Sequence, residues 1–191
     1  MQKAIPTQYG GVNFRSRLEA RWASFFDQCG FQWEYEPFDL DGWIPDFHIS
    51  GKTGSLLVEV KPIDKFDCAV ATKIETAACS NYEILLVGFK INLDPDDADF
   101  LQIGWFGEDT RWGPTDSDEL MWQPAVLGSA CGGPGTLDIG PGFGSFRGRL
   151  NGEYDGMAMC AKGSARHSIL AKWAHAGNKT QWKAVGPKVY A

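Results

Sequence analysis

The chain has 191 residues, of which 43% are hydrophobic and 22% charged, and its formal net charge is −6. These values are typical of a folded globular protein and exclude a fully disordered chain, a collagen and a coiled coil. No apolar run reaches the roughly 18 residues of a membrane-spanning helix, so we expect no membrane partner. The first residues lack the apolar stretch of a signal peptide, and the five cysteines are irregularly spaced. We therefore expect reduced thiols and a cytoplasmic protein.

The charge is unevenly distributed along the chain. Residues 91–130 carry nine acidic residues and one basic residue, Arg111, whereas residues 131–191 carry eight basic and three acidic residues. The acidic run is typical of a solvated loop, and the alternative is a segment, 94–119, that contacts a basic partner. A local basic face remains compatible with the negative total, so a nucleic-acid partner is not excluded.

Hydrophobic periodicity in the first ninety residues predicts alternating helices and strands. An amphipathic helix is expected to begin after Asn13 or Ser16, either of which would cap it, and to end at Gly30. The expected elements are a helix over 15–29, strands over 31–38, 44–49 and 56–61, a helix over 64–80 and a strand over 83–89. This order predicts an α/β (α+β) fold with a mixed central sheet.

The pattern is weaker beyond residue 90. We expect a strand over 100–106, an irregular glycine-rich loop over 128–144, a short helix over 168–176 and a last strand over 180–185.

Two charged residues lie on the third predicted strand, where the surroundings are apolar. Glu59 and Lys61 share one face of the strand, because side chains alternate, while Val58 and Val60 occupy the opposite face. Burying a carboxylate and an ammonium is costly unless each finds a partner. A divalent cation held by Asp46 and Glu59 would offset that cost, and oxygen ligands favour Mg²⁺ or Mn²⁺. The alternative is an ordinary ion pair on an edge strand.

The order of these residues resembles the PD-(D/E)XK nuclease superfamily. The resemblance rests on Glu19 in the first helix, Pro45-Asp46, and Glu59-Val60-Lys61, within a helix–strand–strand–strand–helix–strand frame. It covers about residues 9–90, and the segment over 9–22 is similar to small nucleases of phages and mobile elements. The resemblance implies a restriction-endonuclease-like αβββαβ core, which we place over 1–105. The weaker pattern beyond it predicts a loop-rich extension over 106–191 of unclear fold.

The resemblance also implies a function and a role for each residue. Asp46, Glu59 and the Val60 carbonyl would bind Mg²⁺ or Mn²⁺, and Glu19 would hold a water on that cation or a second ion. Lys61 would position or deprotonate the attacking water, or stabilise charge on the phosphate. The expected protein is a metal-dependent DNA nuclease that hydrolyses phosphodiester bonds, with an endonuclease favoured. Selection of DNA by its structure and a homodimer are open alternatives.

Four basic residues are candidate contacts to DNA phosphates: Arg15, Arg17, Lys65 and Lys73. The alternative for each is a solvated helix face.

Two other functions remain open. The chain could bind nucleic acid without cutting it, or act as a regulator through the acidic 94–119 segment. A zinc site from Cys131, Cys160, His167 and His175 is disfavoured by their wide spacing.

Overall fold

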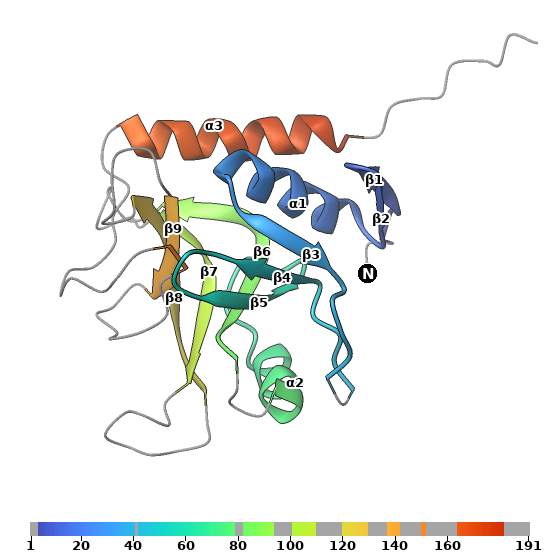
Figure 1. Cartoon of the computed structure of the whole chain (residues 1–191), viewed down its shortest axis with the longest axis vertical. Coiled ribbons are helices and arrows are strands. Elements are labelled where there is room, and N and C mark those ends of the chain that lie inside the picture. Colours follow the sequence, from blue (N-terminus) through green and yellow to red (C-terminus); the bar gives the residue numbers. More distant parts are fainter. Residues whose placement is uncertain are drawn as a thin grey trace, which may run out of the picture.

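A computed structural model describes residues 4–40, 42–78, 82–93, 101–109, 120–129, 137–141, 150–151 and 164–181. Within these ranges the chain forms three helices and two sheets (Figure 1). In chain order the elements are β1 (Thr7–Tyr9), β2 (Val12–Phe14), α1 (Arg17–Cys29), β3 (Gln32–Tyr35), β4 (Phe47–Ser50), β5 (Ser55–Val60), α2 (Cys68–Ala78), β6 (Ile84–Leu93), β7 (Leu101–Asp109), β8 (Leu120–Ser129), β9 (Leu137–Pro141) and α3 (Ser164–Lys179).

Helix α1 has a well-defined cap at each end. Ser16 is its N-cap: the backbone there is extended, and the hydroxyl accepts a hydrogen bond from the Glu19 N–H. Gly30 ends the helix at φ 79°, a left-handed conformation that glycine adopts without a side-chain penalty. The sequence prediction is confirmed for this helix, with Ser16 rather than Asn13 at its start.

The larger sheet has seven strands in the order β3-β4-β5-β6-β7-β8-β9. β5 and β6 are parallel and are joined through α2, and every other neighbouring pair is antiparallel. Figure 1 shows that the sheet curls, with α1 and α3 side by side on one face and α2 on the other. The expected α/β class with a mixed central sheet is confirmed.

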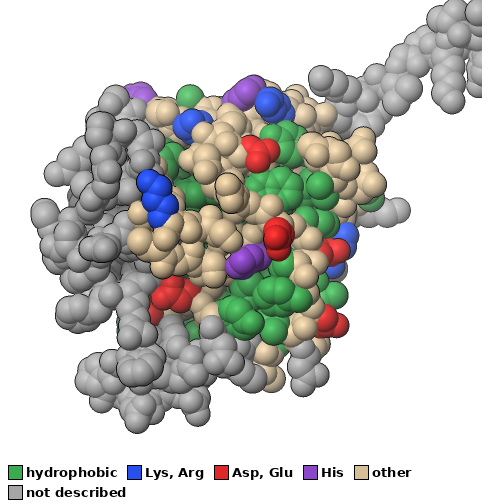
Figure 2. Space-filling model, in the orientation of Figure 1, with side chains coloured by type: hydrophobic (Ala, Val, Ile, Leu, Met, Phe, Trp, Pro, Cys, Tyr) green, Lys and Arg blue, Asp and Glu red, His purple; other side chains and the backbone are tan. Residues whose placement is uncertain are grey.

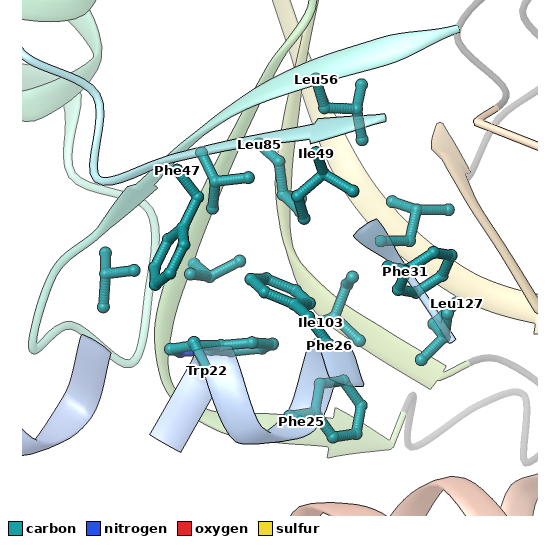
Figure 3. Close-up of a cluster of buried hydrophobic side chains, with 14 of the residues drawn as sticks. Trp22, Phe25, Phe26, Phe31, Phe47, Ile49, Leu56, Leu85, Ile103 and Leu127 are labelled. Atoms are coloured by element: carbon teal, nitrogen blue, oxygen red, sulfur yellow. The ribbon is translucent and has the colours of Figure 1, made fainter. Parts of the chain in front are cut away.

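The hydrophobic core lies on both faces of this sheet. Trp22 and Phe26 project from α1 toward the strands (Figure 3), where the rings of Phe26 and Phe47 are 5.6 Å apart. Val58 belongs to this α1 side, whereas Leu57 packs with the α2 side chains. Alternate residues of β5 therefore serve two separate apolar layers, which fixes the strand at the centre of the fold.

Residues beyond 105 extend the same sheet. β8 pairs with β7, and β9 pairs with β8. α3 packs against α1, and the ring centroids of Trp173 and Trp22 are 4.6 Å apart. The predicted extension therefore contributes to the core of the protein, although its division from residues 1–105 stays a prediction.

Several local predictions were wrong. Residues 128–144 do not form a loop throughout, because β9 (Leu137–Pro141) pairs with β8. The sequence pattern predicted neither of these two strands. α3 (Ser164–Lys179) is longer than the helix expected over 168–176, and the hairpin of β1 and β2 was not predicted. Thr180 and Gln181 lie in no strand, and the rest of the expected strand over 180–185 lies outside the described residues. None of the described helices is long and apolar enough to cross a membrane.

Candidate active site

The β4–β5 hairpin brings Asp46 and Glu59 together. Asp46 immediately precedes β4, and the register that pairs Phe47 with Val58 places Asp46 opposite Glu59 at the same end of the hairpin. Both carboxylates are buried, with 2% and 6% of their surface exposed. We call Asp46, Glu59, the Val60 backbone and Lys61 the carboxylate site.

Asp46 is held by one donor on each oxygen. Its Oδ2 accepts a hydrogen bond from the Val60 N–H at 2.8 Å, and its Oδ1 accepts one from Arg15 Nη2 at 2.7 Å. Burial raises the pKa of Asp46 to about 7, and the neighbouring Glu59 adds to the rise. The Val60 N–H and the Lys61 ammonium act in the opposite direction. The site is therefore short of positive charge.

Glu59 also has a donor on each oxygen. The indole N–H of Trp43 donates to Oε2 at 2.8 Å, and the Lys61 ammonium donates to Oε1. Lys61 Nζ also lies 3.5 Å from the Val60 carbonyl oxygen. Because the N–H and C=O of a strand residue point to the same edge, that carbonyl faces the same side of the strand as Asp46. Two carboxylates, one carbonyl and one amine thus share a single location.

Glu19 lies close to this location but is engaged locally. Its Oε1 accepts from the Ser16 hydroxyl at 2.6 Å, and its Oε2 accepts from the Tyr35 hydroxyl at 2.6 Å and from the Arg15 N–H at 3.2 Å. Burial and the bond to Glu19 raise the pKa of Tyr35 to about 12. The Ser16-to-Glu19 spacing is that of a capping box, which stabilises the start of α1. The predicted role of Glu19 at a cation stays a prediction.

The four basic candidates lie in different surroundings. Arg15 is part of the site, since it contacts Asp46. Arg17 is half-buried at the start of α1, and its buried Nε has no hydrogen-bond partner among the described residues. Lys65, in the loop after β5, and Lys73, on α2, are exposed. On the face drawn in Figure 2, the Lys and Arg side chains of the described residues stand apart and form no continuous basic patch.

The side chains of the described residues do not by themselves form a complete metal site. Within the described ranges, no group of three or more His, Cys, Asp or Glu side chains is arranged to hold a metal ion. A cation at Asp46 and Glu59 would need the backbone and water as further ligands, which is the usual coordination of Mg²⁺. Of the zinc candidates, His167 and His175 lie on α3, while Cys131 and Cys160 lie outside the described residues.

Two residues at the site, Trp43 and Tyr35, were not predicted from the sequence, whereas Glu36 was predicted as a carboxylate that is solvated or supports the site rather than as a metal ligand. Trp43 orients Glu59, Tyr35 holds Glu19, and Glu36 forms an ion pair with Arg15 at 2.8 Å. Glu36 has φ 46°, an uncommon conformation for a residue with a side chain. No local pattern marks these residues, because their partners are brought to them by the fold. The acidic 94–119 segment is described only over 101–109, which forms β7.

Comparison of the chain with protein-family models, curated proteins and solved structures finds no significant match.

Proposed function

We propose that the protein is a divalent-metal-dependent DNA nuclease with a restriction-endonuclease-like core. The observation that carries the proposal is the convergence of Asp46, Glu59 and Lys61 at one end of the central β4–β5 hairpin. Two of these residues are buried carboxylates, and burying charge is costly unless a partner offsets it.

The site fits a hard cation. Asp46 and Glu59 supply carboxylate oxygens, and the Val60 carbonyl is directed toward the same edge of β5. The raised pKa of Asp46 supports the fit, because adjacent buried carboxylates favour either a proton or a cation between them. When bound, Mg²⁺ or Mn²⁺ would activate water and neutralise charge on the phosphate.

The remaining chemistry belongs to Lys61. Its side chain is 38% exposed, so the ammonium can reach a bound phosphodiester while it remains next to Glu59. The amine would hold the attacking water or donate to a phosphate oxygen. In hydrolysis, a bond forms between the water oxygen and phosphorus while the phosphorus bond to the leaving sugar oxygen breaks.

The test is cleavage of a DNA panel containing a junction, a flap, a nicked duplex, a blunt duplex, a single strand and a circular plasmid. The wild-type chain should cut at least one substrate with Mg²⁺ or Mn²⁺, and EDTA should stop the reaction. D46A and K61A should reduce the rate at least 100-fold. K52Q should not change it, because Lys52 is exposed at the opposite end of the hairpin. Equal cleavage by D46A and wild type would refute the proposal.

A second candidate is a nucleic-acid-binding module without catalysis. It is favoured by one observation: every carboxylate oxygen of Asp46 and Glu59 already has a protein donor. In this candidate function the network stabilises the fold and holds no cation. This candidate predicts DNA affinity with a steep salt dependence and no cleavage with any divalent ion.

A further inference from the structure

We propose that Arg15 is a built-in counter-ion that competes with the divalent cation for Asp46 and releases this carboxylate when the cation binds. The inference rests on the proposed function, because it describes how the same site is controlled. Arg15 was predicted from the sequence only as a candidate contact to DNA phosphates.

The guanidinium of Arg15 bridges two carboxylates. Nη2 lies 2.7 Å from Asp46 Oδ1, and Nε lies 2.8 Å from Glu36 Oε1. The planar fork of an arginine is suited to such paired contacts. In the absence of a divalent cation, this guanidinium supplies positive charge directly on a buried carboxylate that also lies near Glu59.

The two partners differ in how easily they can move. The Arg15 side chain is 59% exposed, whereas the Asp46 side chain is 3% exposed. Rotating the guanidinium away from Asp46 toward solvent therefore costs little free energy. Asp46, in contrast, is fixed by its bond to the Val60 N–H. Only Oδ1 is bound by the mobile partner, so one oxygen of Asp46 is anchored by the strand and the other is exchangeable.

The backbone around Arg15 is held in place during such an exchange. The Arg15 N–H donates to Glu19 Oε2 and lies 3.2 Å from the Tyr35 hydroxyl oxygen. Glu36 keeps a backbone bond of its own, from its N–H to the Asp46 carbonyl at 3.0 Å. A short rotation of the Arg15 side chain can thus free Asp46 while Glu36 retains the guanidinium beside the site, where the phosphate of a substrate would arrive.

The first measurement is Mn²⁺ affinity, read from the free-ion signal in electron paramagnetic resonance. Because R15Q removes the competitor, its Kd for Mn²⁺ should be about 3- to 30-fold lower than that of the wild type. K52Q loses the same charge at the far end of the hairpin and should match the wild type, and D46N should lose this binding. A Kd for R15Q equal to or above that of K52Q would overturn the proposal while leaving the cation site in place.

The second measurement follows the exchange directly by NMR during a Mg²⁺ titration. The Arg15 Nη–H signals, assigned by their absence in R15Q, should move away from their ion-paired position as Mg²⁺ binds, because Nη2 is the atom that releases Asp46. The indole N–H of Trp43, which donates to Glu59, reports binding independently. Movement of the Trp43 signal without the Arg15 signal would overturn the proposal alone. If neither signal moves and R15Q binds no Mn²⁺, both the proposal and the cation site are refuted.

Discussion

The burial of Asp46 beside Glu59 predicts a stability penalty that depends on pH. The pKa of Asp46 is about 7 in the folded protein, against an ordinary value of 3.8. A raised carboxyl pKa favours folding fully below the ordinary value, and this contribution is lost as the pH rises through about 7. Each pH unit between the two values corresponds to about 1.4 kcal/mol, so the penalty reaches roughly 4 kcal/mol above neutral pH. The ion pair with Arg15 opposes the rise, which makes this magnitude an upper bound.

D46N cannot ionise at this position and therefore escapes the penalty. We expect it to be more stable than the wild type at pH 8, and this advantage should shrink by about 2–3 kcal/mol at pH 5. The free energy of unfolding is measured by urea titration in EDTA, with the fluorescence of the eight tryptophans as the signal. D64N, which changes an exposed carboxyl in the loop after β5, is the matched control and should show no such change. An advantage for D46N that is absent at pH 8, or equal at both pH values, would refute the reasoning.

Three further substitutions test the supports of the site and the sheet. W43F removes the indole donor from the buried Glu59 carboxylate and should lower the free energy of unfolding by about 1–3 kcal/mol in urea titrations. S16A removes the N-cap of α1 and should cost about 1 kcal/mol, seen as a lower midpoint of thermal unfolding by circular dichroism. G104A would place a Cβ 2.2 Å from the Leu86 carbonyl oxygen. We expect this variant to lose its native near-ultraviolet spectrum, and a native spectrum would contradict the assigned β6–β7 pairing.

The carboxylate site was predictable because its spacing is local. Glu59 and Lys61 are two residues apart on a strand, so they share a face whatever the fold. Asp46 joins them because a short turn pairs β4 with β5, and the sequence pattern marked both strands and the turn. The prediction that Val58 and Val60 face the core is confirmed, since both belong to the apolar layer on the α1 side.

The role of Glu19 shows where a local pattern allowed two interpretations. The family resemblance implied a residue that lies near a cation, and the Glu19 side chain is buried. The Ser16-to-Glu19 spacing equally marks a capping box, and both oxygens of Glu19 accept bonds from Ser16, Arg15 and Tyr35. The sequence pattern alone could not decide between these roles, because Tyr35 lies on a separate strand.

The outer strands were harder to predict for a different reason. β9 alternates Leu137 and Ile139 over only five residues between glycine-rich segments, so its periodicity is brief. This segment becomes a strand because it pairs with the edge of β8 that β7 does not occupy. Backbone groups at a sheet edge need hydrogen-bond partners.

The sequence by itself determined the end of α1 at Gly30, the order of elements from α1 through β6, and the shared face of Glu59 and Lys61, because these depend on residues a few positions apart. Only the tertiary structure decided that Arg15 bridges Glu36 and Asp46, that Trp43 binds Glu59, and that α3 packs against α1. These contacts join distant segments, and their energies depend on burial and charge that exist only once the chain has folded.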